Sequence, residues 1–123
     1  MLNNQQAFAF AEEWIASWNS HDLERILSHY TDDFVMETPL AAQLLPETNG
    51  IVTGKEAVRA YWTIGLQKNP NLLFELKEVL VSVKGITIYY RNVTRNKNVA
   101  EVLWLNDNDK AYRAFAYYGN ENS

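Results

Sequence analysis

The segment WNSHDLERILSHYTDDFVMETP, residues 18–39, contains a complete switch from a helical to an extended pattern. Its first part predicts a helix, because four apolar side chains fall on one helical face, namely Leu23, Ile26, Leu27 and Tyr30. Ser20 or Asp22 can cap this helix. From residue 34 the period becomes two, and Pro39 ends the strand. We therefore predict a short helix followed directly by a strand.

The residues on either side of this segment predict two further helices. Upstream, the apolar positions Phe8, Ala11, Ile15 and Trp18 recur at helical spacing and end near Trp18. Residues 40–52 follow neither period and predict a loop. Thr53 and Glu56 then match a T-x-x-E capping box, and Pro70 ends the helix that follows. Three helices are expected in all.

Residues 72–118 predict consecutive antiparallel strands. Apolar residues occupy even positions up to residue 76 and odd positions from residue 79, which predicts a bulge near Lys77 and Glu78. Gly85, residues 95–98 and residues 107–110 are the expected turns. Because a bulge bends a sheet, we expect a curved sheet wrapped around the helices.

Composition restricts the class of protein. The chain has 123 residues, which predicts a single domain over residues 1–123. Its net charge is -4 and its 11 basic residues are scattered, so nucleic acid is a poor candidate partner. No segment approaches the roughly 20 apolar residues that span a bilayer, and the N-terminus lacks a signal-like pattern. Together with the absence of cysteine, this predicts a cytoplasmic protein without a membrane segment.

The order of these elements resembles the nuclear-transport-factor-2-like superfamily, in its SnoaL-like and ketosteroid-isomerase-like branch. The resemblance rests on residues 18–39 and on TGKEAVRAYWTIGL, residues 53–66, and it covers essentially the whole chain. It implies an α+β fold, a cone in which a curved antiparallel sheet wraps around three N-terminal helices and encloses a pocket. The superfamily includes isomerases, cyclases, hydrolases and proteins without chemistry, so it implies a pocket and leaves the reaction open.

Three positions depart from the isomerase pattern. The isomerases carry a tyrosine on the first helix and another on the third, and Trp14 and Trp62 occupy those positions here. Thr38 occupies the position of the aspartate that is their general base. A hydroxyl cannot take a carbon-bound proton near neutral pH, and a positioned base contributes about 100- to 10,000-fold in rate. Thr38 therefore argues against plain isomerase chemistry.

Glu101 corresponds to the protonated aspartate of the isomerases. Period two predicts independently that it points inward, since it shares a strand face with Val99 and Leu103, and Ala116 falls nearly opposite. Burial would raise its pKa and make it a hydrogen-bond donor. An ion pair with Arg91, which we place almost opposite on the preceding strand, or with Arg113 would instead keep it ionised.

These residues give two functional hypotheses. In the first, the protein binds an apolar, ring-bearing molecule and isomerises, cyclises or hydrates it, with Glu101 as acid or base and Thr38 as a second polar anchor. The expected pocket residues are Trp14, Tyr30, Met36, Trp62, Arg91, Ala116 and Tyr118. The alternative is a noncatalytic ligand-binding or dimeric assembly domain in which Glu101 is locked to Arg91.

The remaining polar residues predict neither a metal nor a cofactor. His21 and His29 are eight positions apart and lack a third ligand, so they do not form a metal site. Asp32 and Asp33 are expected to fix a turn. On the outer sheet face an apolar patch predicts a homodimer interface, formed by Ala100, Val102, Trp104, Phe115 and Tyr117.

Overall fold

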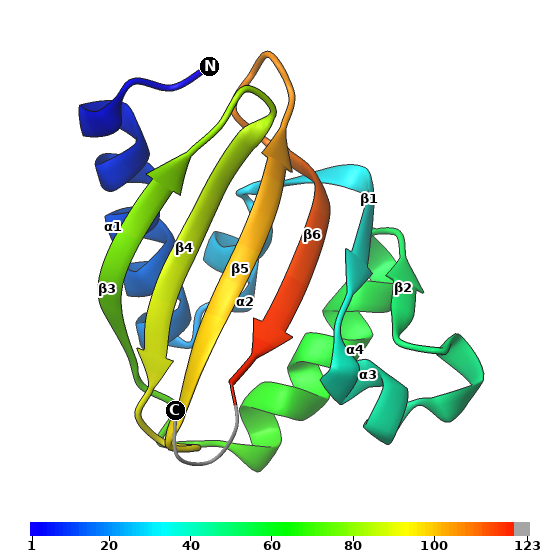
Figure 1. Ribbon diagram of the computed structural model, residues 1–123. Coiled ribbons are helices and arrows are strands. Elements are labelled where there is room, and N and C mark those ends of the chain that lie inside the picture. The colour runs from blue at the N-terminus through cyan, green and yellow to red at the C-terminus, as the bar shows by residue number, and fades with distance from the viewer. Residues whose placement is uncertain (120–123) are drawn as a thin grey trace.

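The computed structural model describes residues 1–119. It contains a bent six-stranded sheet with helices against its inner face (Figure 1). In chain order the elements are α1 (Asn4–Ser20), α2 (Leu23–Leu27), β1 (Tyr30–Glu37), α3 (Pro39–Leu44), the 3-10 helix η1 (Pro46–Thr48), β2 (Ile51–Thr53), α4 (Lys55–Lys68), β3 (Phe74–Val81), β4 (Gly85–Asn92), β5 (Lys97–Leu105) and β6 (Ala111–Tyr118). The fold is α+β, as expected. In the part of the chain that is described, no helix combines the length and the apolar character needed to cross a membrane.

The sheet has the strand order β2-β1-β6-β5-β4-β3. Strands β3 to β6 form an antiparallel meander, and a register shift between Leu76 and Glu78 confirms the predicted bulge. The sheet is mixed, because β1 lies parallel to β6. A meander alone predicts antiparallel pairs only, whereas β1 precedes the meander in the chain and joins the sheet between β2 and β6 (Figure 1).

Side-chain caps define the first two helices. Asn3 and Gln6 form a capping box at the start of α1. Asp22 caps α2 by accepting a hydrogen bond from the backbone of Arg25. The helical stripe ends earlier than predicted, because α2 stops at Leu27 and Tyr30 is already the first residue of β1.

Two predictions about residues 40–56 are wrong. The predicted loop contains α3, η1 and β2, since Thr38 caps α3 and Pro39 occupies its first turn. The capping box of Thr53 and Glu56 does not form, because Thr53 pairs with Val35 in the sheet. Gly54 takes the N-cap position of α4 instead, with a φ of 89° and no side-chain cap.

An aromatic core joins the helices to the sheet. Trp14 of α1 packs against Phe74 and Tyr90, with ring centroids 6.0 and 5.3 Å apart, and Trp18 packs against Trp62 of α4 at 5.0 Å. Large aromatic side chains bury much apolar area and interlock at fixed angles. This packing positions the inner face of the sheet at a fixed distance from α1 and α4, and a cavity lies at one end of that interface.

A candidate active-site pocket

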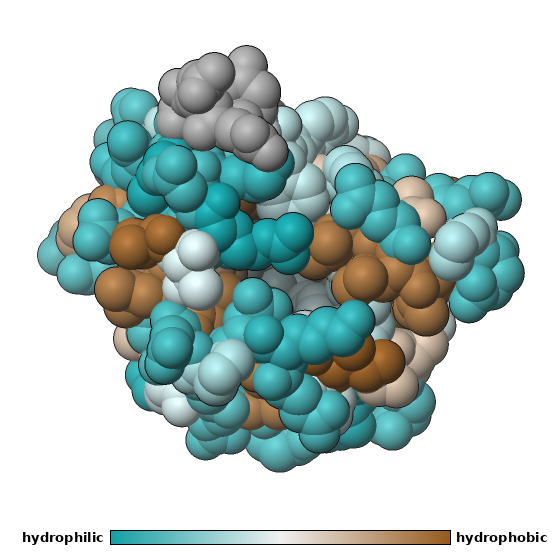
Figure 2. Space-filling view, turned by 90° about the horizontal axis from the view of Figure 1, so that it is seen from below, coloured by the Kyte–Doolittle hydropathy of each residue, from teal (hydrophilic) through white to brown (hydrophobic). Residues whose placement is uncertain are grey.

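A cavity of about 350 Å³ opens at the end of the sheet where β4 turns into β5. Six aromatic side chains line it, namely Trp18, Tyr61, Trp62, Phe74, Tyr90 and Tyr118. Figure 2 shows the hollow from this end, with hydrophilic side chains around its mouth and hydrophobic side chains beside and beneath them. The size and the apolar wall with few polar groups are typical of small-molecule sites.

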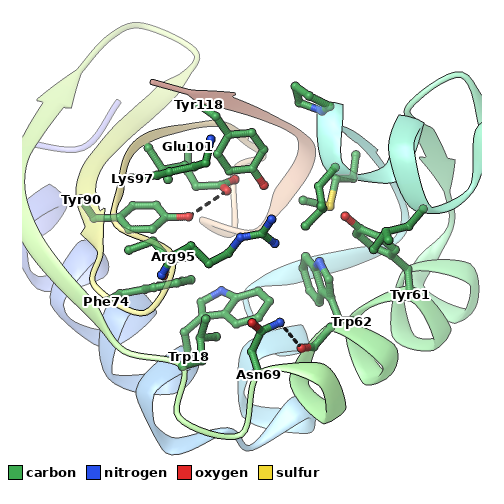
Figure 3. Close-up of a pocket in the computed structure, with 18 of the residues that line it drawn as sticks. Trp18, Tyr61, Trp62, Asn69, Phe74, Tyr90, Arg95, Lys97, Glu101 and Tyr118 are labelled. Atoms are coloured by element: carbon green, nitrogen blue, oxygen red, sulfur yellow. Dashed lines mark hydrogen bonds between the residues drawn. The ribbon is translucent and has the colours of Figure 1, made fainter. Parts of the chain in front are cut away.

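Glu101 is the acidic side chain of this cavity (Figure 3). It lies in β5 between Ile88 and Ala116, it is 5% exposed, and the Tyr90 hydroxyl donates a hydrogen bond to its Oε1 over 3.4 Å. No cation among residues 1–119 lies within ion-pair distance of it. Burial raises the pKa of Glu101 to about 8, and the hydrogen bond from Tyr90 offsets only part of that rise. The carboxyl group is therefore protonated at neutral pH.

The alternative in which Arg91 forms an ion pair with Glu101 is wrong. Arg91 pairs with Asn98 in the sheet, and its Nη1 donates to the Asn98 Oδ1 over 3.0 Å. Burial alternates along β4, so that Ile88 and Tyr90 point inward while Arg91 points to the outer face. Arg113 is not the partner of Glu101 either, since its Nη2 donates to the Glu37 Oε2 over 2.8 Å.

Thr38 lies beside the cavity and does not line it. Its Oγ1 accepts a hydrogen bond from the backbone of Leu40 and lies 3.3 Å from the Tyr118 hydroxyl. Burial raises the pKa of Tyr118 and of Tyr61, so both hydroxyls stay protonated in the neutral range. Thr38 therefore fixes the start of α3 and the position of Tyr118.

Other predicted pocket residues divide into two groups. Met36, Trp62 and Tyr118 line the cavity. Trp14 and Tyr30 do not, because the Trp14 Nε1 donates to the Tyr30 hydroxyl over 2.9 Å within the buried core. Ala116 is likewise buried opposite Glu101 without lining the space.

Several lining residues were not among the predicted ones. Tyr90 and Lys97 carried a usable signal, because they share strand parity with Ile88 and with Glu101, respectively. Arg95 lies in the turn after β4, where no periodicity applies. The buried Nε1 of Trp18 has no hydrogen-bond partner among the described residues, which leaves a donor at the wall of the cavity.

The histidines and the Asp pair lie outside the cavity. The His21 ring donates to the carbonyl of Leu72 over 2.9 Å, and His29 packs near Phe10 and Glu13. Asp32 forms an ion pair with Lys55 at 3.3 Å, and Asp33 accepts a hydrogen bond from Thr31. Within residues 1–119 no three metal-ligating side chains of His, Asp or Glu form a group.

A family model and a solved structure both relate this chain to the SnoaL-like family. The family model of the SnoaL-like domain matches residues 11–115. A SnoaL-like protein of unknown function from Burkholderia thailandensis has a similar crystal structure, with 37% sequence identity, a TM-score of 0.91, and 96% of this chain and 98% of that chain covered. No curated protein matches the chain significantly.

More distant structures share the fold alone. A candidate isomerase of the SnoaL-like family from Agrobacterium tumefaciens is 17% identical, with a TM-score of 0.72 and coverage of 94% and 99% of the two chains. The epoxide hydrolase/cyclase-like enzyme SalBIII, described as acting in pyran ring formation in the polyether salinomycin, is 16% identical, with a TM-score of 0.72 and coverage of 97% and 95%.

Proposed function

The chain belongs to the SnoaL-like family, and we propose that it is an enzyme that isomerises, cyclises or hydrates a ring-bearing small molecule with Glu101 as its acid and base. One observation supports this most strongly. Glu101 is a protonated carboxyl group, 5% exposed, that lines a cavity of about 350 Å³ and has no cationic partner among the described residues. Burying such a group without full hydrogen bonding costs stability, and perturbed carboxyl groups concentrate at functional sites.

The hydrogen bond from Tyr90 assigns the two oxygens of Glu101 different tasks. Because the Tyr90 hydroxyl donates to Oε1, we place the acid proton on Oε2. Oε2 can donate it to a carbonyl, hydroxyl or epoxide oxygen of a molecule in the cavity, and the resulting carboxylate can take a proton back from carbon or from attacking water. The proton count then balances over one turnover, without a second base.

Two proteins of similar fold support the same class of reaction. One is a candidate isomerase and another is described as epoxide hydrolase/cyclase-like. Enolisation of a ketone and opening of an epoxide are both accelerated when an acid protonates the oxygen that gains charge. Glu101 supplies that proton here, and the ring faces of Trp62 and Phe74 supply an apolar surface for the substrate.

The test is turnover of a panel of epoxy alcohols and β,γ-unsaturated ketones, followed by nuclear magnetic resonance. We expect Glu101→Gln to reduce the rate of an accepted substrate by about 100- to 10,000-fold. Glu78→Gln, which removes an exposed carboxylate on β3, is the matched control and should keep the wild-type rate. Full activity of Glu101→Gln would rule out this role. Ligand binding without turnover of any compound would favour the noncatalytic alternative.

We also propose that two copies pair through the outer face of the sheet. Trp104 packs against Phe115 at 5.1 Å, with Lys84 and Arg113 over its ring, and Tyr117 is 63% exposed. No helix covers this face in Figure 1, so a second copy would complete the packing. Analytical ultracentrifugation should give twice the chain mass, and Tyr117→Arg should halve it. A monomeric wild type at micromolar concentration would contradict the proposal.

A further inference from the structure

Two cationic side chains lie at the mouth of the Glu101 cavity. Lys97 shares the inward face of β5 with Val99 and Glu101. Arg95 belongs to the turn before β5, which is held by a hydrogen bond from its backbone to the Asn92 Oδ1 at 3.0 Å. Figure 3 shows the Arg95 guanidinium directed into the space between Tyr118 and Trp62. Both cations would therefore face a molecule that binds in the cavity.

Their charges are not balanced by the cavity. The sole acidic residue of its wall, within residues 1–119, is Glu101, which is protonated at neutral pH. Neither Arg95 nor Lys97 forms an ion pair with an acid in the described part of the chain. The protein as a whole carries a net charge of -4, so the two positive charges at the cavity mouth are opposite in sign to the net charge. A local positive potential of this kind attracts and orients anions.

We propose that the natural ligand is a ring-bearing acid, whose anionic group binds Arg95 and Lys97 while its apolar body lies against the aromatic wall and an oxygen at its far end reaches Glu101. This inference rests on the proposed function and narrows its substrate class. A guanidinium suits an anionic group well, because its planar donors can bind two oxygens of a carboxylate at once.

The strand geometry sets the length of such a ligand. Lys97 and Glu101 lie four residues apart on one strand, which corresponds to about 13 Å between their Cα atoms at roughly 3.3 Å per residue. Their side chains both lean into the cavity, so the groups that they bind are closer than that. A two-ring molecule with an oxygen at one end and a carboxylate at the other matches this arrangement.

The experiment compares 6-hydroxy-2-naphthoate with its neutral carboxamide by isothermal titration calorimetry at pH 7. The two probes share the ring system and the hydroxyl group and differ in charge. We expect the carboxylate to bind about tenfold more tightly at low salt, and the preference to shrink at 0.5 M salt, as exposed ion pairs do. In Arg95→Gln/Lys97→Gln the carboxylate should bind about as weakly as the carboxamide, whose affinity should stay within about twofold.

A matched control removes two positive charges elsewhere. Lys77 lies over the ring of Tyr89, Lys110 donates to the carbonyl of Ser28, and neither lines the cavity of Glu101. Lys77→Gln/Lys110→Gln should leave the preference for the carboxylate unchanged. Equal affinity of the two probes for the wild type, absence of binding by both at millimolar concentration, or equal weakening of both probes in Arg95→Gln/Lys97→Gln would overturn the inference.

This experiment measures binding alone and is separate from the test of catalysis. If Glu101→Gln keeps full turnover while the wild type prefers the carboxylate, the proposed reaction fails and the ligand class stands. If the wild type shows no preference while Glu101→Gln is inactive, the ligand class fails and the proposed reaction stands.

Discussion

Replacing Glu101 by glutamine should remove the pH dependence of stability that this residue imposes. The pKa of Glu101 is about 8 in the folded protein because the side chain is buried, compared with 4.5 for an unperturbed glutamate. Between these two values the folded protein holds one proton more than the unfolded chain. The free energy of unfolding therefore falls as pH rises through this window, and it levels off above pH 8.

The size of the effect follows from the two pKa values. Each pH unit inside the window changes the free energy of unfolding by about 1.4 kcal/mol, which amounts to about 3 to 5 kcal/mol in total. Domains of this size are stable by only about 5 to 15 kcal/mol, so the effect is large. Glutamine has nearly the same shape, its carbonyl can still accept from Tyr90, and it carries no charge at any pH. The variant should equal the wild type near pH 4.5 and exceed it by about 3 to 5 kcal/mol at pH 9.

The assay is urea unfolding followed by tryptophan fluorescence, at half-unit steps between pH 4.5 and pH 9. Other groups also titrate in this range, including His29, whose pKa is lowered by burial. Their contributions cancel in the difference between variant and wild type, provided that they do not contact residue 101. A constant difference across the whole range would refute the reasoning, because it would mean that Glu101 has the same pKa in the folded and unfolded states.

Two further predictions concern the stability of the fold at Gly85 and at Thr38. Gly85→Ala should destabilise the protein by about 3 kcal/mol or more in the same unfolding assay, because the new Cβ would lie 1.9 Å from the backbone oxygen of Leu103. Gly65→Ala is the matched control in open space within α4, and it should raise stability by up to about 1 kcal/mol. Thr38→Val should cost about 1 kcal/mol in thermal unfolding by circular dichroism, since α3 loses its cap. Thr38→Ser keeps the hydroxyl and should keep most of the stability, and equal losses in both variants would show that the methyl group contributes as much as the cap.

Local periodicity predicted the placement of Glu101 correctly, and long-range register failed at Arg91. The orientation of Glu101 depends on the alternation of β5 alone, which runs without interruption from Lys97 to Leu105. The partner of Arg91 depends on where the chain turns. The expected turn at residues 95–98 lies two residues beyond the observed one, which moves the cross-strand partner of Arg91 by four positions, to Asn98. A two-residue error in the predicted position of the turn therefore led to a wrong prediction of the ion pair.

The aromatic wall shows a second limit of sequence patterns. Trp14 and Trp18 are four residues apart on the same face of α1, and both are buried. Trp18 lines the cavity, whereas Trp14 lies behind it and donates its hydrogen bond to Tyr30. Helical spacing identifies the buried face but not the depth of each ring below the sheet, which depends on how far α1 extends beyond β3 and β4.

The position of Thr38 restricts the chemistry to reactions that one acid can perform. Its hydroxyl is occupied by the backbone of Leu40 and by Tyr118, so the place of the missing base holds a structural group. In the proposed reaction Glu101 must then both give and take the proton, and only its protonated form starts the cycle. Because the pKa of Glu101 is about 8, the rate on any accepted substrate should be constant between pH 6 and pH 7 and should fall tenfold per unit well above pH 8. A rate that instead rises with pH through this range would require an ionised base, and would move the catalytic role away from Glu101.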